Sequence, residues 1–295
     1  MDTIGQIVTR IDELLAVIRA APPSAALRDA FAALQFEEIA GSGRLAGARL
    51  DPAEVRALLE RGRALGGHRL EDYLLVRGYA EASAWAARHA VRRGAPTLDD
   101  LRTLHRLAVR GLSETGGMWR THNLAPLADG TVSPPHWMVP FETETLAGRI
   151  ALGEREPAPL ALADALARIA RLRPFDDANG RVARLIANLL AYRRGLPPLA
   201  LDARARRAYR DAMRAADARN IEPLALVVGR ALVRGLERLR DVAEAPAELA
   251  PLTSFARGDA EALYKAAQRG RLRVARRNGR LLTTQAWVDA YRRVT

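Results

Sequence analysis

Apolar residues recur along most of the chain at the spacing of an amphipathic helix, three or four positions apart. One clear run has its apolar positions at Val182, Leu185, Ile186, Leu189 and Leu190. Runs of β-branched residues are rare, alanine and leucine are abundant, and aromatic residues make up only 5% of the chain. These features favour packed helices over sheets, so the pattern predicts an all-α fold.

Two segments interrupt the helical pattern. Asp129 and Gly130 lie between two short extended stretches and are followed by two prolines, which predicts a short β-hairpin over residues 124–139. Further along, two prolines fall in a polar, alanine-rich stretch that indicates a linker at residues 241–250. We therefore expect a separate C-terminal module at residues 251–295.

Composition excludes several classes of protein. The chain has 295 residues, enough for about two domains with real cores, so small disulfide-stapled and disordered proteins are excluded. It has no cysteine, and its five histidines show no metal-binding spacing, which leaves no visible transition-metal site. No run of 18 uncharged apolar residues occurs, so we expect a soluble, cytoplasmic protein without a membrane segment.

The net charge of +12 carries less information than its size suggests. Lys265 is the only lysine among 46 basic residues, and alanine is abundant as well. This combination is typical of a GC-rich coding sequence rather than of selection for guanidinium groups at every position. The basic charge alone therefore supports no function.

Residues 172–184 carry the side chains best suited to phosphate chemistry. Asp177, Asn179 and Gly180 precede the apolar run, so they fall at a helix amino terminus, where free N–H groups and the helix dipole favour an anion. Arg181 and Arg184 can grip phosphate with paired hydrogen bonds, and Asp177 can hold a magnesium ion. An ordinary helix cap followed by solvated arginines would use the same residue types, so the residues alone leave both interpretations open.

The same segment resembles the signature of the Fic (Fido) family, histidine-Pro-Phe-x-acid-Gly/Ala-Asn-Gly-Arg-x-x-Arg. The matching positions are Pro174, Phe175, Asp177, Ala178, Asn179, Gly180, Arg181 and Arg184. The resemblance implies a helical protein that transfers AMP from ATP to a hydroxyl of a target protein. It assigns Mg²⁺ to Asp177, the α- and β-phosphates to Asn179, Gly180 and Arg181, and the γ-phosphate to Arg184. Gly180, where a phosphorylating branch of the family has lysine, points to nucleotidyl transfer.

The resemblance also sets expectations for the rest of the chain. It implies a Fic domain at residues 28–240, including a regulatory-helix region, preceded by an N-terminal helix at residues 1–27. The expected hairpin lies where the family has a flap that docks the target as an added strand. Thr131, Val132 and His136 are the residues expected to dock the target.

Arg173 stands where the family has its histidine. Arginine stays protonated at every pH that a protein meets, so it cannot accept a proton from the attacking hydroxyl. General-base catalysis is worth about 10²–10⁴ in rate, so AMP transfer should be impaired or lost. A permanent cation beside the phosphates would strengthen nucleotide binding without speeding transfer.

Other residues near the motif could replace the missing base. The candidates are Asp176, His122 and His136, although His136 fits better as a surface or target-docking residue than as a base.

A second departure concerns the inhibitory helix of many relatives, whose pattern is Ser/Thr-x-x-x-Glu-Gly/Asn. The nearest match begins at Ser42 and places Ala46 in the position of the inhibitory glutamate, so no carboxylate remains there for Arg184. A plain glycine-rich turn is the other interpretation. Glu37 or Glu38 could supply the carboxylate if the register differs.

The C-terminal module holds ten basic and three acidic residues, +7 of the net charge. Its pattern predicts a helix ended by Gly270, a basic hairpin turning at Asn278 and Gly279, and a last helix capped by Thr284. Helix, hairpin and helix resemble a winged-helix or excisionase-like module that binds double-stranded DNA. A packing appendage with a solvated basic face is the other interpretation.

Three functions remain open. The first is a Fic-fold protein that binds ATP or another nucleoside triphosphate with Mg²⁺, has degraded adenylyltransferase activity and acts as a DNA-associated regulator. The second is an active transferase of the same fold that uses another base, and the third is a relative that no longer binds nucleotide. The expected partners are a nucleoside triphosphate, a target protein, duplex DNA and a second copy of the chain. The intact phosphate residues argue against the third function, and Arg173 favours the first over the second.

Overall fold

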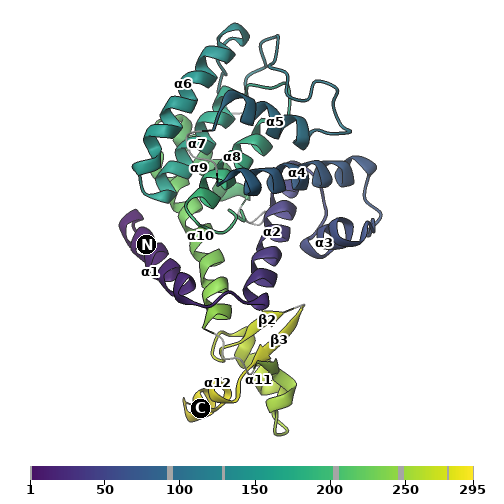
Figure 1. Ribbon diagram of the computed structural model, residues 1–295, viewed down its shortest axis with the longest axis vertical. Helices are drawn as coiled ribbons and strands as arrows, with labels where there is room; N and C mark the ends of the chain where they lie inside the picture. Colours follow the sequence, from purple (N-terminus) through teal and green to yellow (C-terminus); the bar gives the residue numbers. More distant parts are fainter. Residues whose placement is uncertain are drawn as a thin grey trace. The chain divides into compact units, whose positions relative to one another are not determined.

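The computed structural model describes residues 2–91, 96–127, 130–201, 206–244, 249–277 and 279–294. Its α-helices are α1 (Ile4–Ala20), α2 (Ala25–Leu45), α3 (Pro52–Arg61), α4 (Leu70–His89), α5 (Leu98–Ala108), α6 (Val139–Leu152), α7 (Ala158–Leu172), α8 (Asn179–Arg193), α9 (Arg206–Asp217), α10 (Glu222–Ala243), α11 (Ala260–Gln268) and α12 (Gln285–Val294). Short 3-10 helices are η1 (His136–Met138), η2 (Gly153–Arg155) and η4 (Leu252–Phe255), and the strands are β1 (Ala250–Pro251), β2 (Ala275–Arg277) and β3 (Arg280–Thr283). The prediction of a mostly helical chain is confirmed (Figure 1).

The chain divides into two compact units. The first consists of Met1–Asp12 and Leu34–Gly235, and the second of Glu13–Ala33 and Leu236–Thr295. The expected boundaries at residues 27/28 and 240/241 stay predictions, and residues 245–248 of the expected linker lie outside the described residues.

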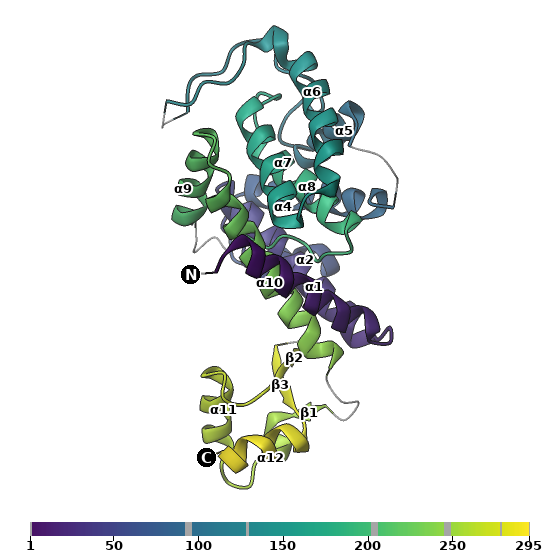
Figure 2. The same ribbon diagram turned by 90° about the vertical axis from the view of Figure 1, so that its left-hand side faces the viewer.

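α8 is the core helix of the first unit. Figures 1 and 2 show it among α4, α5 and α7, all of which contact it. Every residue from Arg181 to Ala191 is buried, so the helix is enclosed on all sides and not on the single face that the apolar spacing predicted. Arg181 and Arg184 must therefore find hydrogen-bond partners inside the protein.

A glycine allows α4 and α5 to approach closely beside α8. A Cβ atom at Gly78 would lie 2.8 Å from the Leu107 carbonyl oxygen and 3.1 Å from that of Ala108, at the carboxyl end of α5. Backbone atoms cannot move aside as a flexible side chain can. The end of α5 can therefore lie this close to α4 only because residue 78 has no side chain.

The predicted β-hairpin over residues 124–139 does not form among the described residues. Residues 123–127 and 130–135 are not strands, residues 136–138 are η1, and Val139 begins α6. The Leu127 N–H donates to the Thr131 carbonyl, and the Gly130 N–H donates to the Leu127 carbonyl. Prolines at positions 126, 134 and 135 have no N–H group, which prevents a longer ladder of hydrogen bonds. Asp129, half of the predicted turn, lies outside the described residues.

The C-terminal elements agree with the sequence pattern. The helix ended by Gly270 is α11, the basic hairpin is β2 and β3, and the Thr284 hydroxyl accepts the Trp287 N–H at the start of α12. β3 pairs antiparallel with β2 and also with β1, a strand that the sequence did not predict. Asn278, in the predicted turn, lies outside the described residues.

No helix in the described part of the chain is both long enough and apolar enough to cross a bilayer.

We predict that Gly78→Ala lowers the free energy of unfolding by about 1–2 kcal/mol. The clash with two carbonyl oxygens outweighs the gain of about 1 kcal/mol that alanine brings to a helix. Gly148→Ala in α6 is the matched control, because nothing lies within 4 Å of its added Cβ, and it should leave stability unchanged or raised. Urea unfolding of both variants measures the difference, and equal stability would show that α4 and α5 are not in tight contact here.

Candidate functional site

The loop between α7 and α8 has two residues in left-handed backbone conformations. Arg173 has φ 47° and Ala178 has φ 60°, both unusual for residues other than glycine. Asn179 closes the loop between them, because its side-chain oxygen accepts the Phe175 N–H (2.9 Å) and its amide donates to the Phe175 carbonyl (2.7 Å). The side chain of Asn179 thus shapes the loop, and the N–H groups of the first turn of α8 remain for a ligand.

Stacked aromatic rings pack against this loop on its buried side. Phe175 is fully buried, stacks on His105 with ring centroids 3.8 Å apart, and contacts Trp119 at 5.1 Å. Nδ1 of His105 accepts the Gly117 N–H (2.9 Å), so the proton of this imidazole lies on Nε2. Burial, helped by the charge of Arg181, lowers the pKa of His105 to about 4, and a hydrogen bond with the backbone of Asp177 opposes that shift. His105 is therefore a neutral support for the loop at physiological pH.

Arg120 joins the loop to the segment that precedes α6. Its guanidinium donates to the carbonyl groups of Arg173 (2.7 Å), His122 (3.1 Å) and Pro134 (2.5 Å), and its own N–H donates to the Pro174 carbonyl. The residue is only 2% exposed. Backbone groups from three places along the chain are thus held together by one side chain.

Arg181 and Arg184 lie buried at the start of α8, 5% and 6% exposed. Arg181 donates to the Ala108 carbonyl at the end of α5 (2.8 Å) and to the Asp177 carboxylate (3.1 Å). Arg184 donates to both the hydroxyl (2.7 Å) and the carbonyl (3.1 Å) of Ser42 in α2. Both guanidinium groups are therefore fixed in place before any ligand binds.

A buried carboxyl group lies near Arg184 on α2. Glu38 is 1% exposed and accepts the Tyr79 hydroxyl (2.5 Å). Burial raises the pKa of Glu38 to about 7, although Tyr79, Arg184 and Asn188 act in the opposite direction. Among the alternatives left open by the sequence, Glu38 lies close enough to Arg184 for the positive charge of Arg184 to act on its carboxyl group. Ala46 is exposed just beyond the end of α2, and its assigned role stays a prediction.

The residues at the loop suit magnesium bound together with phosphate. The Asp177 side chain is 86% exposed, and Gly180 is exposed beside it on the first turn of α8. No group of three or more His, Asp or Glu side chains able to hold a metal is found in the described part of the chain. Mg²⁺ commonly takes one or two protein carboxylates and completes its shell with waters and phosphate oxygens. Asp177 next to free helix N–H groups fits this donor set.

Side chains around the loop reach toward the segment before α6. Nη1 of Arg173 donates to the Ala125 carbonyl (2.8 Å), so this residue is tied to the segment where the flap was expected. Val132 is 63% exposed, Thr131 accepts through its carbonyl, and His136 donates its N–H to Asn123. Their predicted role in target docking stays a prediction.

The structure brings together two of the substitute bases considered from the sequence. Nδ1 of His122 lies 3.7 Å from Oδ1 of Asp176, and both side chains are exposed. The third candidate, His136, hydrogen-bonds Asn123 instead.

Residues 95–191 match the family model described as the Fic/DOC family. The chain carries a Fic/DOC domain. It is 26% identical over 213 residues to the protein adenylyltransferase Fic of Drosophila grimshawi, an alignment that covers 68% of this chain and 42% of that protein. The chain thus spans about two fifths of the length of this relative.

Solved structures agree with the Fic/DOC assignment. A Fic domain containing signaling protein from Bacteroides thetaiotaomicron matches with a TM-score of 0.72 and 20% identity, over 82% of this chain and 97% of that chain. A Fic family protein from Desulfovibrio desulfuricans matches with a TM-score of 0.66 and 18% identity, over 97% and 96%. Identities this low show the fold alone, which is the mostly helical Fic fold that the resemblance implied.

The Fic/DOC match contains the loop and its supports but not every partner of its arginines. His105, Arg120 and residues 173–184 lie within the match, whereas Glu38 and Ser42 lie before it. The sequence assigned no role to His105 and none to the Ser42 hydroxyl. No local signal marks either residue, because their partners lie far along the chain.

We predict that Glu38 makes the stability of the protein depend on pH. The pKa of Glu38 is raised from its ordinary 4.5 to about 7 in the folded chain, so between these values the folded state keeps a proton that the unfolded state has lost. Stability from this group is complete below about pH 4.5 and is lost as pH rises through 7.

Glu38→Gln removes this titration. The free energy of unfolding of the variant relative to wild type should rise by about 3 kcal/mol between pH 4.5 and 7.5. Urea unfolding across this range measures it, with Glu144→Gln, exposed on α6, as control. A difference that does not change with pH would contradict the burial of an ionisable Glu38.

Proposed function

We propose that this chain is a Fic-domain protein that binds a magnesium nucleoside triphosphate, transfers AMP to a target-protein hydroxyl weakly or not at all, and acts as a DNA-associated regulator. One observation carries the nucleotide part. The loop, its free N–H groups, Asp177 and both arginines lie together at the start of α8, and Arg173, which the motif resemblance assigns to the position of the base, donates to the Ala125 carbonyl.

The binding half of this proposal follows from the chemistry of the loop. The N–H groups of the first turn of α8 and the exposed Gly180 offer donors to phosphate oxygens, and the helix dipole adds to their attraction. Asp177 would hold Mg²⁺ against the same oxygens. Arg181 and Arg184 are already oriented by carbonyl and hydroxyl groups, so little side-chain entropy is lost when they meet an anion.

The weak transfer follows from the lack of a group that can accept the proton of the attacking hydroxyl. In AMP transfer the target hydroxyl oxygen bonds to the α-phosphorus, the bond from that phosphorus to the bridging oxygen breaks, and pyrophosphate leaves. The hydroxyl proton must pass to a base, and the Arg173 guanidinium cannot accept it. Arg173 instead donates to the Ala125 carbonyl, which removes an acceptor from the segment expected to dock the target.

A second candidate function is an active transferase that uses His122. The observation that favours it is the pairing of His122 with Asp176 at 3.7 Å on the exposed side of the loop. A carboxylate beside an imidazole orients the ring and stabilises its protonated form, as general bases require. At 3.7 Å the two atoms are within ion-pair range but beyond a normal hydrogen bond, so substrate binding would have to bring them closer.

We predict that ATP with Mg²⁺ binds the wild-type chain saturably and that Arg184→Gln weakens binding by about 1.5–3 kcal/mol, the scale of a charged hydrogen bond. Arg207→Gln is the matched control, because the Arg207 side chain is 95% exposed on α9. Calorimetry measures both affinities, with thermal unfolding as a check that each variant folds. Absence of saturable binding by ATP, GTP, CTP and UTP at millimolar concentration would contradict the proposal.

We predict that Arg173→His gains self-modification with ATP, at a rate roughly 10²-fold or more above wild type. Histidine tolerates the left-handed backbone of this position better than most residues, so the variant should fold. Mass spectrometry detects the added AMP, and Arg173→Ala, which supplies no base, is the control.

The same assay separates the two candidate functions. Transfer by the wild-type chain that survives in Arg173→Ala and disappears in His122→Ala would overturn the first candidate and establish His122 as the base. Little or no transfer by wild type and by Arg173→Ala, with a gain in Arg173→His, would support the first.

A further inference from the structure

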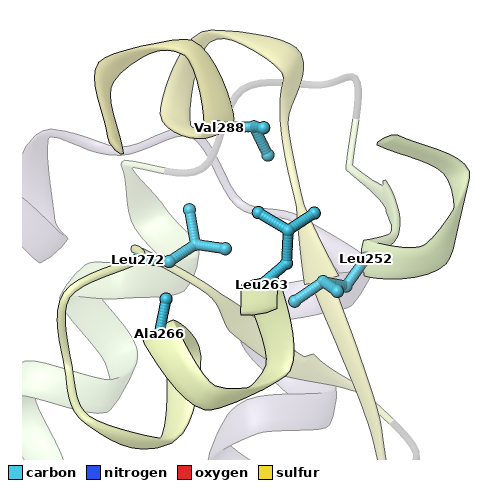
Figure 3. Close-up of a cluster of buried hydrophobic side chains, with 5 residues drawn as sticks. All are labelled: Leu252, Leu263, Ala266, Leu272 and Val288. Carbon is cyan, nitrogen blue, oxygen red and sulfur yellow. The ribbon is translucent and has the colours of Figure 1, made fainter. Parts of the chain in front are cut away.

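The C-terminal elements have a hydrophobic core of their own. Leu252, Leu263, Ala266, Leu272 and Val288 are buried together, from η4, α11, the turn that follows and α12 (Figure 3). Ten basic and three acidic residues surround this core between positions 251 and 295. The basic side chains are therefore not needed as core residues, and their contacts show which of them have a structural role.

Two of these arginines are structural. Arg273 donates to the Glu244 carboxylate (2.5 Å), and its guanidinium lies over the Trp287 ring, 4.6 Å from the centroid. Arg292 donates to the Asp259 carboxylate (2.7 Å) and to the Phe255 carbonyl (3.1 Å). These side chains hold the module together and are poorly placed to bind anything else.

At the end of α11 and on the β2–β3 hairpin, four arginines are exposed and have no carboxylate partner among the described residues. We call them the arginine surface: Arg269, Arg271, Arg276 and Arg280. The acidic residues of the module are engaged elsewhere, since Asp259 pairs with Arg292, Glu261 with Lys265, and Asp289 accepts from Gln285. The charge of the arginine surface is thus uncompensated within the described part of the module.

We propose that the arginine surface binds the phosphate backbone of duplex DNA. The inference rests on the proposed association of this chain with DNA and assigns that association to four residues. A guanidinium group makes paired hydrogen bonds to phosphate, and a two-stranded ribbon such as β2–β3 fits the major groove between the backbones. Contacts of this kind are independent of sequence.

The aromatic residues favour a duplex over a single strand. Proteins that bind single-stranded nucleic acid stack its bases on exposed aromatic rings. Here the face of Trp287 is covered by Arg273, while Phe255 and Tyr291 pack against the core. Tyr264 is 39% exposed, and no second aromatic ring among the described residues of the module is exposed beside it. A stacking platform is therefore missing, and phosphate contacts are what this surface offers.

The experiment uses the full chain and a fluorescent duplex of about 25 base pairs, with affinity measured as a function of salt. Four phosphate contacts predict a slope of log K against log salt of about −3.6, a loss of about 10²-fold between about 50 and 200 mM salt. Replacing all four residues of the arginine surface by glutamine should abolish this salt-dependent binding. The pair variants at positions 269 and 271, or 276 and 280, should each reduce the slope by about 1.8.

Two controls locate the effect. A variant with the same change in net charge replaces four exposed arginines of the first unit by glutamine, namely Arg49, Arg61, Arg63 and Arg155, and should bind DNA as wild type does. Arg273→Gln should lower the thermal stability of the module, because Arg273 contacts Glu244 and Trp287. The same variant should change the salt slope of DNA binding little.

Each result has a defined meaning. If wild type binds no duplex, the proposed DNA association fails together with this inference, whereas nucleotide binding, measured separately by calorimetry, is untouched. If the four-residue variant binds as wild type does, the association stands and the assigned surface is wrong. Stronger binding to single-stranded DNA, to RNA or to vesicles with anionic lipid than to the duplex would overturn the choice of partner.

Discussion

Two buried guanidinium groups on the first turns of α8 constrain the helices around it. A charged group taken out of water costs several kcal/mol unless hydrogen bonds replace its hydration. Arg181 finds its acceptor at the carboxyl end of α5, and Arg184 finds two on α2, so the ends of both helices must meet the start of α8. Because Gly78 has no side chain, α4 can pack closely against the same end of α5, next to the carbonyl groups of residues 107 and 108. The hydrogen bonds that the buried guanidinium groups of Arg181 and Arg184 require thus link the packing of the core helices to the geometry of the loop.

The loop itself is maintained by groups that do not change charge at physiological pH. His105 is neutral, Asn179 uses its amide on the backbone of Phe175, and Arg120 binds carbonyl groups on both sides. Arg173 takes part in this network through its carbonyl, not its side chain. The loop contacts of this network therefore do not depend on which side chain stands at position 173, the position that the motif resemblance assigns to a histidine. A difference in that side chain affects proton transfer and the contact with Ala125.

Features that depend on neighbouring residues could be predicted from the sequence, whereas contacts between residues far apart along the chain could not. The start of α8, the stop at Gly270 and the cap at Thr284 each depend on neighbouring residues, and the structure has them where the pattern placed them. The predicted hairpin does not form because the prolines that flank the turn have no N–H group to donate across a strand pair, and turn residues cannot compensate for this. Ser42 and Arg184 are 142 positions apart, and no pattern within one sequence connects them. For the same reason the sequence could not decide among Ala46, Glu37 and Glu38 for the position of the inhibitory glutamate, since that choice depends on which face of α2 meets α8.

An arginine-rich composition makes net charge a poor guide to function, and the contacts of each arginine replace it. Arg120, Arg181 and Arg184 are buried and satisfied by carbonyl, hydroxyl and carboxylate groups, so they organise the Fic/DOC domain. Arg292 is bound to a carboxylate within the C-terminal module, Arg273 is bound to the Glu244 carboxylate just after α10, and both stabilise the module. Random drift toward arginine would spread unpaired guanidinium groups over the surface, with no reason for the carboxylates of this module to be taken by other partners. The module instead keeps its acidic residues engaged and leaves the arginine surface exposed at the end of α11 and on the hairpin, without a carboxylate partner among the described residues, so that an external anion can balance its charge.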